Sequence, residues 1–276
     1  MTMNLCVSAL AAAALIGLPA SASANVVRLG QYSVNQCCST SDGPQTSAVA
    51  NGLEYVGEVS PLYLSGIGVI VAGRFDDAFT SWIAAGGAFI FHDWSASQAN
   101  TLPGMAQVTE GPDVARSNID VLAPDHAIVS GPFGILDGTS MDGGNFSNHG
   151  AVSLASLISD DPAVTDLTAL LGNGHPNAVT EFSYRYGAGL VIYASMPTDA
   201  YTGSHPFATP GTDGLAILGK NEVAYAARLA RTASVAEPAS LGLLGAGFAA
   251  WIGLRTRRGS RQTSCHGKMP RTVGRT

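Results

Sequence analysis

The chain has 276 residues, of which 46% are hydrophobic and 12% are charged, enough for one large domain or two small ones around a hydrophobic core. This composition excludes a disordered, collagen-like or coiled-coil chain. Residues 25–233 carry 7 Lys and Arg against 19 Asp and Glu, a net charge of −12, whereas residues 255–276 hold 7 basic residues and no acidic one. The acidic main body lacks the clustered cations that phosphate contacts need, so no nucleic-acid partner is expected.

The first predicted element is an export signal over residues 1–24. Residues 4–24 form an apolar run that closes on small side chains at Ala22 and Ala24, a pattern typical of a secretory signal peptide cleaved after Ala24. The run is too short for an ordinary membrane span. No Lys or Arg precedes it, so the only positive charge in front of it is the amino terminus. We therefore expect the secretion machinery as a partner.

Cysteine usage agrees with export into an oxidising compartment. Apart from Cys6 in the signal and Cys265 near the other end, the chain holds only the adjacent pair Cys37 and Cys38. Neighbouring cysteines can close only a strained ring, so a labile vicinal disulfide and two unpaired thiols in a loop both fit. A redox role is disfavoured because no C-x-x-C thiolate motif is present.

Between residues 25 and 231, apolar strand-like runs alternate with helical patterns and Gly-rich turns. This order predicts one α/β domain, a single doubly wound, mostly parallel sheet flanked by helices. The predicted strands are Val26–Tyr32, Gly66–Ala72, Ala88–Phe91, Ala178–Tyr184 and Leu190–Ser195, the last two joined by a hairpin-like return. One predicted helix is capped by Asp76 and Asp77 and ends at Gly86-Gly87, and a second, Leu215–Arg231, closes the domain.

Three segments of this domain resemble the trehalose-utilisation (ThuA-like) proteins of the class I glutamine-amidotransferase-like, flavodoxin-like fold. They are WIAAGGAFIFHDW around His92, DHAIVSG from Asp125 and YGAGLVIY from Tyr186. The resemblance covers about residues 26–231 and implies a fold more strongly than an activity. It places the best site candidates at His92, Asp125 and His126, whereas the Gly-His of the family after the late strand is replaced by residues 196–199.

The histidines carry the chemistry that this sequence could support. His92 and Asp93 follow a predicted strand, at the edge where open α/β sheets bind ligands, and Asp125-His126 would join them if it lies on the same edge. Such a group could bind a divalent metal through His92 and His126, or act as acid and base. The spacing matches no metal motif, and a hydrogen-bonded structural role is the favoured interpretation. The chain also has no G-x-C-x-G or G-x-S-x-G, which disfavours a hydrolase with a nucleophile elbow and leaves catalysis uncertain, leaning to none.

Two further features allow a binding and a structural interpretation. The polar loop Gly138–Gly150 could offer oxygens to a cation or a sugar, but its composition favours a surface loop. Aromatic side chains late in the domain could stack on sugars, although packing in the core or at the sheet edge is favoured. They are Tyr184, Tyr186, Tyr193 and Tyr201, together with Trp94.

After a linker at residues 232–240, the chain carries a hydrophobic segment and a basic cluster. Glu237-Pro238 precedes the apolar residues 241–254, and Arg255, Arg257 and Arg258 follow them. These parts, in this order, resemble the PEP-CTERM sorting signal of Gram-negative bacteria, with Ala-Glu-Pro in place of Pro-Glu-Pro. The resemblance implies a short helix at residues 241–258, held transiently in the inner membrane with its basic end in the cytoplasm, until an exosortase-type transpeptidase cuts near the motif. A permanent anchor and a buried core helix are the alternatives, and residues 259–276 form a basic tail.

The sequence therefore predicts an exported, surface-sorted protein of the periplasm, cell surface or extracellular space. Its α/β domain is expected to be a non-catalytic module that binds a ligand or glycan, or that associates with the envelope or with exopolysaccharide. The alternative is a metal-assisted or acid/base carbohydrate-active enzyme that uses His92, Asp93, Asp125 and His126.

Overall fold

The computed structural model describes residues 26–34, 42–93, 95–113, 117–142, 148–196 and 213–234. Several predictions fall outside these ranges: the signal peptide, Cys37 and Cys38, the linker, the motif Glu237-Pro238, the hydrophobic segment, the cluster Arg255, Arg257 and Arg258, and the basic tail. Within the described ranges, no helix has both the length and the apolar content that a bilayer span requires.

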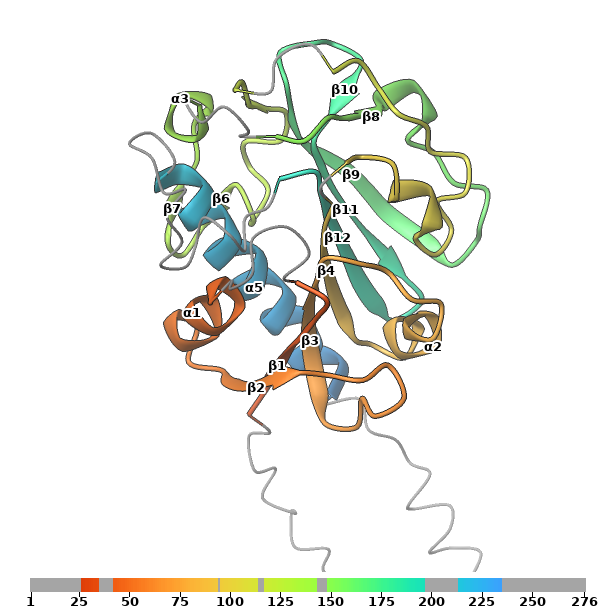
Figure 1. Cartoon of the computed structure of the whole chain (residues 1–276), viewed down its shortest axis with the longest axis vertical. Coiled ribbons are helices and arrows are strands. Elements are labelled where there is room, and N and C mark those ends of the chain that lie inside the picture. Colours follow the sequence, from red (N-terminus) through yellow and green to blue (C-terminus); the bar gives the residue numbers. More distant parts are fainter. Residues whose placement is uncertain are drawn as a thin grey trace, which may run out of the picture.

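The predicted α/β fold is confirmed by a mostly parallel sheet with helices on both faces (Figure 1). In the described part of the chain its eight strands are, in spatial order, β2 (Glu54–Glu58), β1 (Arg28–Tyr32), β3 (Ile67–Ala72), β4 (Ala88–His92), β12 (Gly189–Ala194), β11 (Glu181–Tyr186), β9 (Val164–Gly172) and β5 (Asp120–Val121). The strands from β2 to β12 are parallel, whereas β11 is antiparallel to β12 and β9, and β5 is antiparallel to β9. The carboxyl ends of the parallel strands therefore meet at one edge, the carboxyl edge.

The central strands are the ones that the sequence marks most clearly. Every residue of β4 and of β12 is buried, as expected for continuous apolar runs covered on both faces. Tyr184 and Tyr193 are also fully buried, so they belong to the core, as the favoured interpretation of these tyrosines has it. The core is divided by the sheet into two apolar clusters, one on each face.

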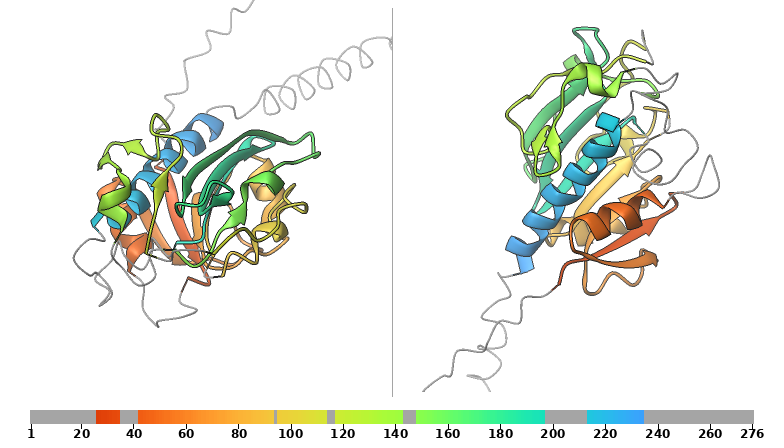
Figure 2. Two further views of the ribbon diagram at one scale, coloured as in Figure 1. Left: turned by 90° about the horizontal axis from the view of Figure 1, so that it is seen from above. Right: turned by 90° about the vertical axis from the view of Figure 1, so that its left-hand side faces the viewer.

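Three helices cover the two faces of the sheet. Helices α1 (Gly43–Ala50) and α5 (Asp213–Ser234) lie on one face, where α5 packs against β3, β4 and β12 (Figure 2). Helix α2 (Phe79–Ala84) lies on the other face. The predicted cap of α2 is displaced by one to two residues: the N-cap is Ala78, and Asp76 Oδ1 accepts the Ala78 N–H just before the helix, at 3.0 Å.

Short elements complete the domain. They are η1 (Ala99–Thr101), β6 (Ser130–Gly131), β7 (Gly134–Ile135), α3 (Gly138–Met141), β8 (Val152–Ser153), η2 (Leu154–Ser156) and β10 (Ala178–Val179). The segment that carries β6 and β7 lies against α5, because the Asn221 side chain accepts the Phe133 N–H and donates to Gly134 O, both at 3.1 Å. These two hydrogen bonds fasten the β6–β7 segment to α5.

Candidate functional site

The carboxyl edge brings together side chains from three neighbouring strands. Glu181 of β11 is paired with Ala194 of β12, and Ala194 is paired with His92 of β4. Residues directly opposite one another in adjacent strands point to the same face, so all three side chains project toward α5. The two outer strands are about 10 Å apart, and the small Ala194 between them leaves room for the longer side chains on either side.

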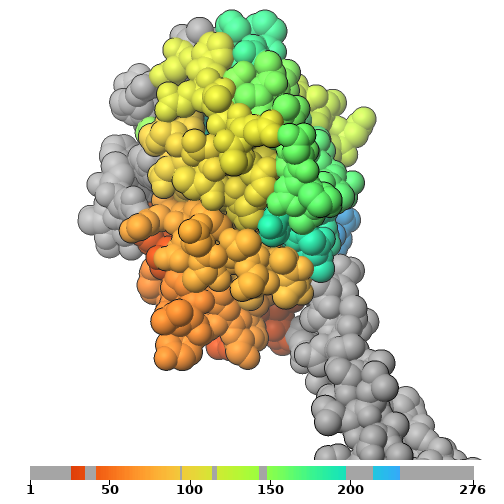
Figure 3. All heavy atoms as spheres, turned by 90° about the vertical axis from the view of Figure 1, so that its right-hand side faces the viewer, coloured from red at the N-terminus to blue at the C-terminus, as the bar shows by residue number. Residues whose placement is uncertain are grey.

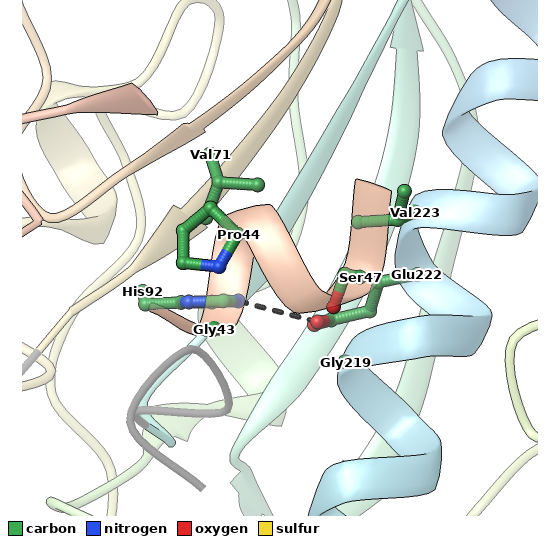
Figure 4. Close-up of a pocket in the computed structure, with 8 residues that line it drawn as sticks. All are labelled: Gly43, Pro44, Ser47, Val71, His92, Gly219, Glu222 and Val223. Carbon is green, nitrogen blue, oxygen red and sulfur yellow. Dashed lines mark hydrogen bonds and ion pairs between the residues drawn. The ribbon is translucent and has the colours of Figure 1, made fainter. Parts of the chain in front are cut away.

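His92 forms a buried ion pair with α5. Its Nε2 lies 3.2 Å from Glu222 Oε2, and the two side chains are only 3% and 1% exposed. Figure 4 shows the imidazole and the carboxylate pointing at one another, with Ser47 of α1 beside them. The pair borders a small cavity. The volume that the centre of a water molecule can occupy in it is about 10 Å³, which is enough for about one water. This space is too small for a substrate.

Glu181 adds a second carboxyl group to this buried pair. Its side chain is fully buried, and neither of its oxygens has a hydrogen-bond partner among the residues that the structure describes. Burial raises the pKa of Glu181 well above its usual range, repulsion from Glu222 raises it further, and the nearby His92 opposes both effects. The cluster of His92, Glu181 and Glu222, here called the buried cluster, therefore favours a neutral Glu181.

Asp93 holds the loop after β4. Its carboxylate accepts the backbone N–H groups of Ser95 at 3.0 Å and of Gln98 at 2.9 Å. On the buried side it also accepts the Tyr193 hydroxyl at 3.3 Å, and the Asp93 side chain is completely buried. These contacts occupy the carboxylate in positioning residues 93–98.

Asp125 and His126 lie in the connection between β5 and β6, away from the contacts of Asp93. The His126 ring packs edge-on against Tyr225 of α5, with the ring centroids 5.0 Å apart, and its Nδ1 accepts the Ile128 N–H at 3.3 Å. Partial burial and the positive charge of Arg228 lower the pKa of His126. The contacts found for His92 and His126 thus lead to different residues of α5, and the site roles assigned to Asp125 and His126 stay predictions.

The described part of the structure adds no cluster of metal ligands to the hypothesis that His92 and His126 bind a metal. Among the described residues, no group of three or more His, Cys, Asp or Glu side chains is arranged to hold a metal ion. Sequence reasoning also missed Glu181 and Glu222. Glu222 is a single carboxyl group on the apolar face of α5, and this pattern is the signal that could have revealed it, whereas Glu181 shares its strand with Ser183 and Arg185 and carries no such signal.

An open pocket lies beside the buried cluster at the carboxyl edge. Its volume is about 260 Å³, measured in the same way, and its lining is Ser95, Ala96, Glu110, Gly111, Asp113, His149, Gly150 and Ala151. Two backbone hydrogen bonds and one from a side chain build its wall. Gly111 N–H donates to Ala151 O and His149 N–H donates to Ser195 O, both at 2.7 Å, and the Ser195 hydroxyl donates to Gly150 O at 2.6 Å. Because Ser195 directly follows β12, the pocket is fixed to the end of a central strand.

The chemistry of the open pocket is that of a hydrogen-bonding site. Glu110 and Asp113 are exposed carboxylates that accept hydrogen bonds, and Ser95 and His149 add a hydroxyl and an imidazole. Gly150 has a φ of +110°, a conformation that a residue with a side chain rarely adopts, so a glycine is needed at this wall. The Ser95 hydroxyl donates to Asp93 at 3.3 Å and lies 2.6 Å from Ser97 Oγ, so the loop itself already engages it.

Comparisons with known proteins give only distant likenesses. No family model and no curated protein matches the chain. Among solved structures, a ThuA-like protein from Bacteroides uniformis ATCC 8492 is 12% identical, with a TM-score of 0.42 and coverage of 74% of this chain and 93% of that one. The exo-β-1,4-mannosidase Op5Man5 from Opitutaceae bacterium strain TAV5 is 13% identical, with a TM-score of 0.39 over 62% of this chain. A β-galactosidase from Bacillus circulans sp. alkalophilus is 12% identical, with a TM-score of 0.38 over 63%. The chain matches 31% of the mannosidase and 29% of the galactosidase, about a third of each.

Proposed function

We propose that this chain is an exported, surface-sorted protein of the PEP-CTERM type, whose ThuA-like α/β domain binds a hydroxyl-rich ligand of the glycan class without catalysis. The observation that carries the proposal is the set of contacts that the residues at the end of β4 make. His92 faces the buried Glu222 and Asp93 is occupied by its own loop, whereas Ser95 opens onto the pocket.

Binding without catalysis follows from which groups can reach a ligand. A general acid or base must lie within hydrogen-bonding distance of the atom on which it acts. The His92 side chain is 3% exposed and that of Asp93 is completely buried, so neither presents its polar atoms to the open pocket. The side chains that do line the pocket, among them Ser95, Glu110 and Asp113, can orient a ligand through hydrogen bonds, and the proposal assigns them binding and not acid–base catalysis.

The negative charge of the two carboxylates in the pocket limits which glycans we expect to bind. Glu110 and Asp113 accept hydrogen bonds from sugar hydroxyls and disfavour a ligand that is itself anionic. We expect a neutral or amino sugar to bind in preference to a uronic acid, and we expect the contact to be with the outermost residues of a surface polymer. Export and sorting are supported by the two terminal segments of the sequence, the apolar run before Ala24 and the segment that ends in Arg255, Arg257 and Arg258.

The test is calorimetric binding of a neutral hexose, a hexosamine, an N-acetylhexosamine and a uronic acid by the full chain purified from an exporting cell. We expect Glu110→Gln together with Asp113→Asn to weaken binding about tenfold or more, because each loses a hydrogen bond to a charged acceptor, worth about 1.5–3 kcal/mol. Asp166→Asn is the matched control, since Asp166 is an exposed carboxylate on β9 whose φ of +55° suits asparagine.

Two outcomes would contradict the proposal. If none of the four sugars binds, the pocket is not a glycan site. If the chain, incubated separately with oligosaccharides of these sugars, cleaves one of them and the cleavage is abolished by His92→Ala but not by Asp166→Asn, the domain is the carbohydrate-active enzyme of the alternative hypothesis.

A further inference from the structure

Two adjacent apolar side chains stand out on the surface. Leu62 and Tyr63 are 78% and 80% exposed, and they lie in the connection between β2 and β3. Val26, just before β1, is 62% exposed. Single exposed apolar residues are common on soluble proteins, but two neighbours this exposed on one loop indicate a contact.

This loop crosses from the carboxyl edge, where the Val59 N–H donates to Gln31 O at 2.8 Å, to the amino edge, where β3 begins at Ile67. Leu64 packs inward on the core, and its carbonyl accepts the N–H of Ile67, the first residue of β3, at 3.1 Å. The tip at Leu62 and Tyr63 is therefore within a few residues of the start of β3. Figure 3 shows the orange part of the chain, which includes this connection, at the lower end of the molecule.

The end of α5 reaches the same edge. A Cβ atom added to Gly68 of β3 would contact both Val27 and Ala230, so the last turns of α5 lie at the beginnings of β1 and β3. Helix α5 ends at Ser234, at the lower end of the domain in Figure 1. The start of β1, the end of α5 and the loop that carries Leu62 and Tyr63 thus share one end of the domain.

The sequence after α5 indicates which surface the amino edge of the domain faces. Six residues, 235–240, separate Ser234 from the apolar segment 241–254. Fully extended, they span at most about 20 Å. If segment 241–254 lies in a bilayer, as the proposed sorting signal requires, the amino edge is held within that distance of the membrane surface.

We propose that the amino edge of the domain docks on the lipid surface, with Leu62 and Tyr63 inserted at the level of the headgroups. The inference rests on the membrane segment of the proposed function. Tyrosine suits this depth because its ring is apolar and its hydroxyl remains hydrated, and leucine adds apolar area. Of the charged side chains nearby, Arg28 and Glu54 form an ion pair, with Nε 3.4 Å from Oε1. The contacts that Leu62 and Tyr63 make with lipid are apolar, so added salt does not weaken them.

The experiment places an environment-sensitive fluorescent amino acid at position 63 of the full chain, reconstituted into vesicles of phosphatidylethanolamine and phosphatidylglycerol. The matched control carries it at position 135. Ile135 is as exposed, at 77%, but it lies on the segment beside the first half of α5, where Gly134 O accepts a hydrogen bond from the Asn221 side chain. Brominated lipids should quench the probe at position 63 at least threefold more strongly than the probe at 135, in 50 mM and in 500 mM salt alike.

Flotation of the same vesicles separates the two levels of the proposal. A chain that floats with the vesicles but shows equal quenching at positions 63 and 135 overturns the docking and leaves the membrane segment intact. A chain that does not float overturns the membrane segment, and the docking with it. Leu62→Ser provides a second check, because it should reduce the quenching at position 63 while the chain still floats.

Discussion

At the scale of single residues, the buried cluster raises a question of charge. If His92 is protonated, it balances Glu222, and an ionised Glu181 would then add an uncompensated negative charge with no hydrogen-bond partner in the described structure. An unpaired buried charge is far more costly than a neutral carboxylic acid. Burial and repulsion from Glu222 thus favour the protonated form of Glu181 in the folded protein, so folding takes up a proton at this position when the pH lies above the usual pKa of a glutamate.

The pH dependence of stability should reveal this proton. The pKa of Glu181 is raised in the folded protein, and its usual value is 4.5. A raised folded-state pKa gives a stabilising contribution that is complete below the unfolded pKa and is lost as the pH rises through the folded pKa. We therefore expect Glu181→Gln, which is neutral at every pH, to gain stability relative to the wild type as the pH rises from 5 to 9.

Urea unfolding at a series of pH values measures this difference. The quantity to plot is the unfolding free energy of Glu181→Gln minus that of the wild type, because contributions from the other titrating groups cancel in it. A difference that stays constant from pH 5 to 9 would show that Glu181 has the same pKa in the folded and unfolded chains. Asp166→Asn serves as the control and should give a flat difference.

The sequence located part of this cluster but not its partners. His92 could be placed at the carboxyl edge because a continuous apolar strand ends beside it. Its partner Glu222 is 130 positions away, and no local pattern joins the two residues. Asp93 was predicted to take part in a site, whereas its contacts are those of a loop-organising residue, since Ser95 and Gln98 supply donors within five positions. Contacts between residues far apart in the sequence decide such roles. The periodicity of the sequence carries no information on these contacts.

At the scale of elements, the close approach of α2 to β12 depends on glycines. A Cβ on Gly189 would collide with the carbonyl oxygen of Ile83, and one on Gly87 would collide with the Trp82 ring. Gly86, with a φ of +118°, ends the turn after α2. The Gly86-Gly87 pair was predicted only to stop the helix, but its second glycine also makes space for α2 against the sheet.

Gly189→Ala should therefore destabilise the domain through contact with backbone that cannot move aside. The cost expected for such overpacking is about 1–3 kcal/mol, or more when the obstacle is main chain. Gly57→Ala is the comparison, because Gly57 has open space around it and pays only for its φ of +77°, about 1–2 kcal/mol. Chemical denaturation should show the larger loss for Gly189→Ala, and equal losses would mean that α2 shifts to relieve the contact.

The elements that the sequence predicted are those buried on both sides or clearly amphipathic. β3, β4, β12 and α5 were all anticipated from their apolar patterns. Of the elements that were not predicted, the longest are α1, β2 and β9. Their residues are polar or half exposed: α1 has the sequence GPQTSAVA, β2 is an edge strand with glutamate at both ends, and β9 begins with exposed residues. Tertiary packing and not local pattern defines such elements.

At the scale of the whole molecule, the two edges of the sheet carry different features. The carboxyl edge carries the open pocket and the buried cluster, whereas the amino edge receives the beginning of β1 and the end of α5. A membrane segment attached behind α5 would therefore hold the domain with its pocket turned away from the bilayer. This orientation suits a protein that binds a polymer outside the membrane, and it follows from α5 running antiparallel to the parallel strands.

The membrane segment itself can be tested through its basic end. The apolar stretch 241–254 is short for a span, so the cluster Arg255, Arg257 and Arg258 should be what stops it from passing through the bilayer. We expect replacement of all three arginines by glutamine to release the chain from the membrane fraction before it is cut. Its intact mass should then start at Asn25 and include residues beyond Pro238, whereas the wild-type mature protein should end near Glu237-Pro238.

The matched control removes the same charge farther from the apolar stretch, through Arg261→Gln, Arg271→Gln and Arg275→Gln. Charges stop translocation most effectively next to the apolar segment, because there they would have to enter the hydrocarbon first. The control should therefore fractionate and be cut like the wild type. If both triple variants are released alike, total positive charge and not its position retains the segment. If neither is released and neither is cut, residues 241–254 act as a permanent anchor and the sorting hypothesis is wrong.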